Sequence, residues 1–189
     1  MSMPVSFSKT PLVLDAISAL KVTNYYGVSS LDNVYCYLRI YVRAGALIFS
    51  ITSFEQQPSG DSRAGLALCF GDQAQYLFLD CNAFGALRAR LFSPATDAKD
   101  IPAATLASPV PELFRGVDEQ GYHWGFSLTL DAAWLQARFD TALTPGNIFL
   151  GNVYKFVEGE DAFGSAFPSP QSNGMPCRAG FGEFVVVPY

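Results

Sequence analysis

The sequence predicts an all-β protein, a two-sheet antiparallel β-sandwich with one or two short helices. Three observations predict it. Apolar and polar residues alternate in many short segments, Gly, Pro, Asn and Asp separate those segments, and helical periodicity is scarce. The 189 residues fit a single domain, 1–189. A hydrophobic fraction of 50% excludes intrinsic disorder.

The first predicted strand, Val34–Val42, shows the clearest alternation, with an aliphatic side and a side of Tyr and Arg. A turn at Gly45 leads into Leu47–Phe54, so this pair predicts an antiparallel hairpin. Further strands are expected in the segments that alternate between turn signals: Gly65–Phe70, Gln75–Cys81, Ala86–Phe92, Gly121–Leu130, Ile148–Val157 and Phe184–Val187.

One segment has apolar residues at helical spacing, Asp131–Phe139, and Asp131 is suited to cap its N-terminus. A second helical turn is expected within Val13–Leu20. The segments Ser93–Pro111 and Glu158–Ala179 are polar and contain proline, so we interpret both as loops. Loops longer than about 15 residues often carry function.

The charge balance excludes some classes of partner. A net charge of −5 argues against a sequence-independent nucleic-acid binder and against a polybasic membrane-surface protein. No apolar run reaches the roughly 18–20 residues of a transmembrane helix. The N-terminus lacks a charged segment followed by an apolar one. The chain is therefore either not secreted or has lost its signal, and a cytoplasmic location is favoured.

Motifs for catalysis and metal binding are scarce. A nucleophile–histidine site would have to use His123, the one histidine, which lies in no recognisable motif. Paired carboxylates for glycoside hydrolysis remain open, since such pairs are distant in sequence. The four cysteines form no CxxC pair, which excludes a readable zinc knuckle. Glu158-Gly-Glu-Asp161 offers oxygen ligands for calcium, but its spacing fits no EF-hand and favours a solvated acidic turn.

Six segments between Ser30 and Tyr189 carry motifs in a shared order. They are Val34–Phe54 followed by Glu55, Tyr76–Gly85 ending in Asn-x-x-Gly, His123–Leu130 before the helix, Gly151–Lys155, Phe163–Pro168 and Cys177–Gly182. Together they resemble the family 9-like carbohydrate-binding modules, which are β-sandwiches related to DOMON-type domains. Two places depart from the family pattern. Arg63–Leu68 lacks the usual acidic residue, and Phe167 stands where a Trp is common.

The resemblance implies a non-catalytic module that binds a mono- or oligosaccharide. A second hypothesis is a degenerate sandwich that acts as a protein-interaction or structural module without sugar binding. A third is a small glycoside hydrolase.

A sugar site combines an aromatic face, on which the ring stacks, with planar polar groups that bond hydroxyls. The resemblance places the stacking aromatic at Phe167, and we expect sugar contact at Asn152, Lys155, Phe163 and Phe167. On a regular strand Asn152 and Lys155 would face opposite ways, so a bulge or strand end would be needed to bring them together. The alternative is that both phenylalanines pin the loop onto the sandwich.

A second candidate is a ligand face of aromatic and cationic residues, provided that two strands join on one sheet. Arg can donate to a carboxylate or to neighbouring hydroxyls. The alternative is that another sheet or loop covers this face, with arginine stems lying along the rings. Its members are Tyr35, Tyr37, Arg39, Arg43, Arg88 and Arg90. By contrast, Trp124 shares a wholly apolar face and is predicted to lie in the core.

Overall fold

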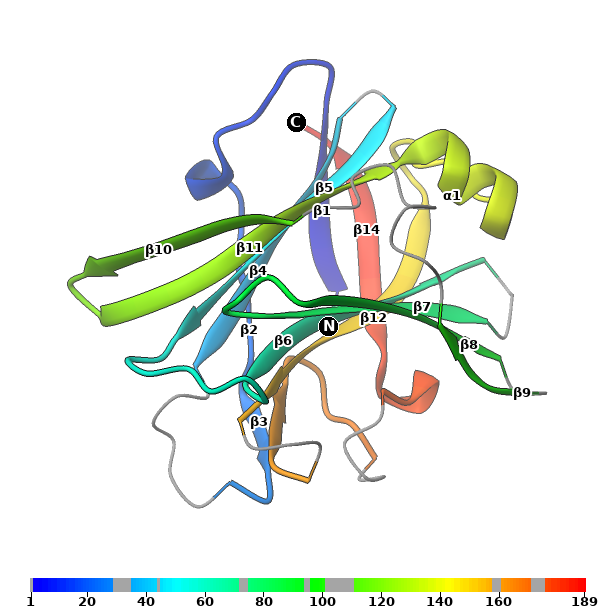
Figure 1. Ribbon diagram of the computed structural model, residues 1–189. Helices are drawn as coiled ribbons and strands as arrows, with labels where there is room; N and C mark the ends of the chain where they lie inside the picture. The colour runs from blue at the N-terminus through cyan, green and yellow to red at the C-terminus, as the bar shows by residue number, and fades with distance from the viewer. Residues whose placement is uncertain are drawn as a thin grey trace.

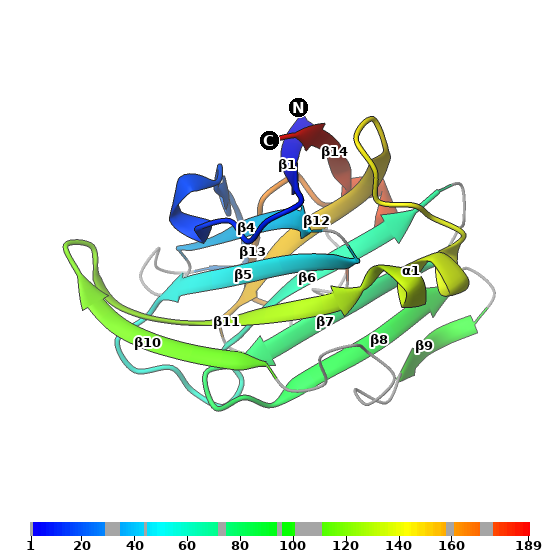
Figure 2. The ribbon, with the colours of Figure 1, turned by 90° about the horizontal axis from the view of Figure 1, so that it is seen from above.

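The computed structural model describes residues 2–28, 35–43, 45–71, 75–93, 96–100, 111–157, 161–170 and 176–189. Its strands form one continuous hydrogen-bonded path that folds over into two layers (Figures 1 and 2). The first layer contains, in order, β10 (Glu112–Asp118), β11 (Gly121–Asp131), β5 (Ala46–Phe54) and β4 (Cys36–Arg43). The second contains, in order, β14 (Gly182–Pro188), β12 (Ile148–Phe156), β6 (Arg63–Phe70), β7 (Tyr76–Asn82), β8 (Leu87–Ser93) and β9 (Thr96–Asp100).

The strand β1 (Ser2–Ser8) joins the two layers, because it pairs with β14 along 2–7 and with β4 along 6–8. Both pairings are parallel, so the sheet is mixed rather than strictly antiparallel as predicted. The partner strand β14 lies at the other end of the chain, so no local sequence pattern predicts that it pairs with β1. Burial of Met3 and Val5 stabilises the junction.

Short elements complete the fold. Two of them predicted correctly are the helix α1 (Ala132–Phe139) and the 3₁₀ turn η1 (Leu14–Ala16). Asp131 caps α1, since its Oδ1 accepts from the N–H groups of Ala133 and Trp134 at 2.6 and 3.1 Å. The remaining ones are β2 (Leu20–Lys21), β3 (Asn24–Tyr26), β13 (Phe163–Ser165) and η3 (Arg178–Gly180).

The main core lies between the layers and takes side chains from β1, β4, β5, β6, β7, β8, β11, β12 and β14. Trp124 and Phe126 of β11 meet Leu66 and Leu68 of β6 and Leu79 of β7 there, all at most 2% exposed. Trp124 is thus a core residue, as predicted. Its indole Nε1 also donates to Glu55 at 3.0 Å, which satisfies the one polar atom of the ring.

The predicted strands are confirmed within a residue or two at their ends, except that Val34 lies outside the described residues. Six strands were missed: β1, β2, β3, β9, β10 and β13. β13 lies within the segment predicted as the loop Glu158–Ala179. β9 lies within the segment predicted as the loop Ser93–Pro111, and β10 follows it directly. β10 carries charges at Glu112, Arg115 and Asp118 and is largely exposed, because it is an edge strand whose pairing to β11 needs no clean alternation.

Candidate functional site

The predicted site residue Lys155 lies inside the sandwich rather than on its surface. Its Nζ, fully buried, donates to Glu55 Oε2 at 3.1 Å, to Ser62 Oγ at 2.6 Å and to the carbonyl of Phe156 at 3.0 Å. Burial lowers the pKa of the Lys155 ammonium, and the Glu55 carboxylate opposes that shift. All three donor positions are used within the protein, so none is left for a hydroxyl of a ligand.

Asn152 points to the other side of β12, because the ladder to β6 runs without a bulge from Phe149 to Phe156. Its Nδ2 donates to the carbonyls of Phe167 and Gly180 at 2.9 and 2.8 Å. Its Oδ1 accepts from the N–H groups of Ala166 and Phe167 at 3.1 and 3.0 Å. The side chain is fully buried and clamps the segment after β13 against the sheet. The bulge that would have brought Asn152 and Lys155 together is absent from this ladder.

The two phenylalanines of the predicted site are also buried. Phe163 is 2% exposed and stacks on Tyr26 with ring centroids 4.7 Å apart. Phe167 is 8% exposed and meets Phe184 edge-on. Phe163 anchors its loop in the apolar cluster on the outer side of the second layer, and Phe167 anchors it in the main core. Sugar contact at Asn152, Lys155, Phe163 and Phe167 stays a prediction, which their burial does not favour.

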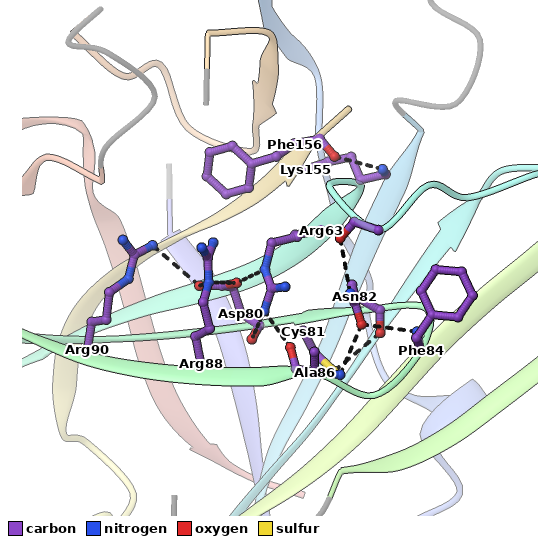
Figure 3. A network of polar contacts seen from close by, with 11 residues as sticks. Arg63, Asp80, Cys81, Asn82, Phe84, Ala86, Arg88, Arg90, Lys155 and Phe156 are labelled. Atoms are coloured by element: carbon purple, nitrogen blue, oxygen red, sulfur yellow. Dashed lines mark hydrogen bonds and ion pairs between the residues drawn. The ribbon is translucent and has the colours of Figure 1, made fainter. Parts of the chain in front are cut away.

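The second candidate face is divided by the fold. Arg88 and Arg90 lie on the outer side of the second layer, where they converge with Arg63 on the fully buried carboxylate of Asp80 (Figure 3). Tyr37, Arg39 and Arg43 lie on the outer side of the first layer. The two sets therefore face away from one another and do not form the single surface that was considered.

The outer side of the first layer has its own groove, and the strand register explains it. One row across the strands reads Tyr37, Thr52, Gly125 and Phe114 from β4 to β10. The next row reads Arg39, Ser50, Ser127 and Glu112. Large side chains stand on the outer strands of each row and small ones on the middle strands, so the sheet surface is concave.

Two glycines let aromatic rings lie flat along this groove. A Cβ atom on Gly125 would come within 2.3 Å of Phe114 Cζ, and one on Gly116 within 2.8 Å of the His123 ring. The rings of Phe114 and His123 therefore occupy the space that a side chain on the cross-strand partner would need. Each ring therefore lies over the glycine on the neighbouring strand.

A first cavity of about 410 Å³ lies over this floor, within the usual size of a small-molecule site. η1 forms one wall with Leu14 and Asp15, and an ion pair of 3.2 Å between Asp15 and Arg39 holds it. The guanidinium of Arg39 lies 4.7 Å from the centre of the Tyr37 ring. Other lining residues are Ser50, Thr52, Phe114, Asp118, His123 and Ser127.

Two polar atoms on this cavity are buried without a hydrogen-bond partner, Arg39 Nε and His123 Nδ1. The nearest charged group to the latter, Asp118 Oδ2, is 3.6 Å away, which is beyond hydrogen-bond distance. Buried polar groups without a partner cost about 1–3 kcal/mol each. Because these two atoms have almost no exposed surface, a ligand hydroxyl would recover that cost once the side chains of Arg39 and His123 turn toward the cavity.

A second cavity of about 360 Å³ continues the groove and shares Leu14 and Ser127 with the first. Within the described part of the chain, the side chains of Arg43 and Glu112, which line this cavity, make no hydrogen bond or ion pair. The second cavity is further lined by Leu12, Tyr41, Arg43, Ile48, Glu112 and Thr129. The groove thus has an aromatic end and a more charged end.

The sequence predicted Tyr37, Arg39 and Arg43 as members of a ligand face, but it did not predict Phe114 or His123 there. The available signal was the hairpin of β10 and β11. A turn at Asp118–Gly121 sets the register that pairs Phe114 with Gly125 and His123 with Gly116. Because β10 was not among the predicted strands, its register with β11 could not be predicted.

Metal and membrane features are few. Among the described residues no three His, Cys, Asp or Glu side chains gather as a metal site, and the acidic turn considered for calcium lies at 158–160 outside those residues, with Asp161 at its edge. The helices of the described part include none that is both long and apolar enough to cross a membrane.

Comparison with known proteins places the fold. No family model matches the chain, and no curated protein matches its sequence. Among solved structures, a candidate carbohydrate-binding protein from Bacteroides uniformis superimposes with a TM-score of 0.68 and 14% identity over 98% of both chains. A family 9 carbohydrate binding module from Caldicellulosiruptor kristjanssonii, in complex with cellotriose, matches with a TM-score of 0.60 and 12% identity over 100% of this chain and 95% of that one. The same module with glucose matches at 0.60 and 12%, over 100% and 97% of the two chains.

These likenesses span the whole chain, so the protein has a fold like that of the family 9 modules, as the six sequence segments predicted. The relation to DOMON-type domains stays a prediction. At 12–14% identity the likeness concerns the fold alone.

Proposed function

We propose that this protein is a non-catalytic carbohydrate-binding module and that the groove over β4, β5, β11 and β10 is its binding site. The observation that carries the proposal is the first cavity. There, the rings of Tyr37 and Phe114 flank small hydroxyl side chains beside two buried polar atoms that lack partners. Aromatic faces together with planar polar groups are the combination that a pyranose requires. The Bacteroides uniformis protein of the same fold is described as carbohydrate-binding, and the family 9 module is in complex with cellotriose and with glucose.

The groove is also favoured over the loop site by what each offers a ligand. At the loop site the polar atoms of Asn152 and Lys155 are saturated by internal partners. In the groove, Arg39 can donate through Nε, and His123 has an unused ring nitrogen. Because the platform is Phe rather than the more electron-rich Trp, we expect weak binding, near millimolar or about −4 kcal/mol.

A glycan array followed by calorimetry with the sugars that bind tests this proposal. Phe114→Ala should reduce binding at least tenfold, because it removes the stacking face. The matched control is Phe84→Ala, which truncates a ring that is 62% exposed and lies outside the groove. Equal binding by wild type and Phe114→Ala would overturn the site, and binding to no glycan would overturn the function.

A specific observation keeps one rival in view, the interaction module without sugar binding. Four apolar side chains at the β10–β11 hairpin and the neighbouring turn are exposed: Phe84 at 62%, Leu113 at 44%, Val117 at 65% and Tyr122 at 54%. Leu113 lies against Gly85, and Val117 pairs directly with Tyr122. Contiguous exposed apolar surface is typical of protein contacts. A partner that binds wild type but not Val117→Lys would favour this rival, provided that no glycan binds.

A further inference from the structure

The two cavities form one continuous groove, and its direction is set by the strands. The first cavity is centred on the row that contains Tyr37 and Thr52. The second is centred on the row that contains Tyr41, Ile48 and Thr129. Tyr37 and Tyr41 are four residues apart on β4, which corresponds to about 13 Å along the strand. Leu14 of η1 lines both cavities and marks the boundary between them.

We infer that the groove binds a linear oligosaccharide of about three residues along the strands, rather than a single sugar. This inference rests on the proposed function. The span of about 13 Å between Tyr37 and Tyr41, which line the first and the second cavity, is longer than one hexose ring. The 410 Å³ of the first cavity accept one sugar, and the 360 Å³ of the second leave room for another. The residue between them would pass beside Leu14.

The two ends of the groove make different contributions to such a ligand. The first end stacks and orients one residue between the rings of Tyr37 and Phe114. The second end has no flat-lying ring of this kind over a glycine, but it presents the uncommitted charges of Arg43 and Glu112 on opposite walls. A guanidinium donates to neighbouring hydroxyl oxygens and a carboxylate accepts from hydroxyls. The second end can therefore form hydrogen bonds with hydroxyl groups that only a longer ligand places there.

The charges also restrict the ligand to uncharged sugars. Along the whole groove the carboxylates are Asp15, Asp118 and Glu112, while the guanidiniums are Arg39 and Arg43. The ion pair of Asp15 with Arg39 leaves two carboxylates against one guanidinium. A chain of uronic or sulfated residues would meet this excess of negative charge and, at long range, the net charge of −5.

Calorimetry with sugars of increasing length tests the inference. The probes are glucose, cellobiose, cellotriose and cellotetraose, with the β-1,4-linked xylose and mannose series in parallel. For the series that binds, we expect the Kd to fall at least tenfold from one residue to three and to change less than twofold from three to four. Oligogalacturonate should bind at least tenfold more weakly than the neutral trisaccharide.

Two variants locate the gain in affinity. In Arg43→Ala and in Glu112→Ala, which both lie at the second end, the ratio of the monosaccharide Kd to the trisaccharide Kd should fall toward 1. The matched control, Arg138→Ala, removes a surface arginine of α1 outside the groove and should keep the wild-type ratio.

The outcomes separate this inference from the proposed function. Equal Kd values for mono- and trisaccharide in wild type would overturn the inference and leave the proposed function in place. A length dependence that survives unchanged in both Arg43→Ala and Glu112→Ala would likewise overturn it. Binding of no sugar in any series, and of none on the glycan array, would overturn the proposed function and this inference with it.

Discussion

The buried polar clusters around β12 and the groove on the opposite layer use similar residue types in opposite ways. In the clusters, Lys155 and Asn152 find all their hydrogen-bond partners inside the protein. In the groove, Arg39 Nε and His123 Nδ1 are buried and have none. We infer that the motif residues shared with family 9-like modules hold this sandwich together, while the capacity to bind a ligand lies where polar groups are left unsatisfied.

The satisfied polar clusters stabilise the fold because they connect segments that are far apart in sequence. Glu55 follows β5, Ser62 precedes β6 and Lys155 is the next-to-last residue of β12. Their contacts join both layers at one corner. Asn82 connects the β7–β8 turn to the segment before β6. Its Oδ1 accepts from the N–H groups of Phe84 and Ala86 (Figure 3), and its Nδ2 donates to the carbonyl of Gly60. Such fully satisfied networks specify one arrangement of the chain.

The largest effect that the comparison predicts is on Lys155. Lys155→Ala should lower the free energy of unfolding by about 3–5 kcal/mol, because it leaves the buried Glu55 carboxylate without its cation. Urea denaturation measures this. The double variant Glu55→Gln with Lys155→Met should recover much of the loss. A loss below about 1 kcal/mol would show that the ion pair does not hold this corner.

Phe167 distinguishes the two regions most directly, since a sugar-stacking ring and a loop anchor behave differently when truncated. With 8% exposure and a contact to Phe184, Phe167→Ala should cost about 3 kcal/mol, toward the low end for a buried aromatic. The folded fraction should bind sugar as wild type does. An unchanged melting temperature with lost binding would return the site to this loop.

Alkaline pH probes the buried region through its protonated groups. Burial raises the pKa of Cys36 to about 12 from 9.0, so the folded state holds a proton that the unfolded state releases. The stability that this thiol contributes is complete below pH 9 and is lost as the pH rises toward 12, at about 1.4 kcal/mol per pH unit.

Urea midpoints at pH 7.5 and pH 10 measure this loss, and Cys36→Ala should show a smaller drop between the two. The variant is needed because the lowered pKa of Lys155 acts in the opposite direction below pH 10.5. The same drop in both proteins would mean that Cys36 is not the source of the pH dependence.

The smallest stability effect is expected in the groove. His123→Ala removes a side chain without a hydrogen-bond partner at Nδ1, so the free energy of unfolding should change by less than about 0.5 kcal/mol, while sugar binding should weaken. Thermal unfolding and calorimetry measure the two quantities. A large loss of stability with intact binding would place His123 among the structural residues.

The sandwich could be predicted from the sequence because the patterns that indicate strands and turns are local. Alternation in Val34–Val42 and in Gly121–Leu130 places Leu38 and Trp124 on an inward face whatever the partner strands are. The cap at Asp131 likewise depends only on the residues that follow it. The six motif segments added the family-like fold, since their order survives even where single residues have changed.

The tertiary structure decided which side chains are free to meet a ligand. Whether Lys155 points at solvent or at Glu55 depends on a partner 100 residues away, and no spacing rule on β12 contains that information. The groove required the register of four strands, β4, β5, β11 and β10, together with the wall that η1 places over them. Concavity and unsatisfied hydrogen bonds are properties of several segments at once, and they exist only after the strands have paired.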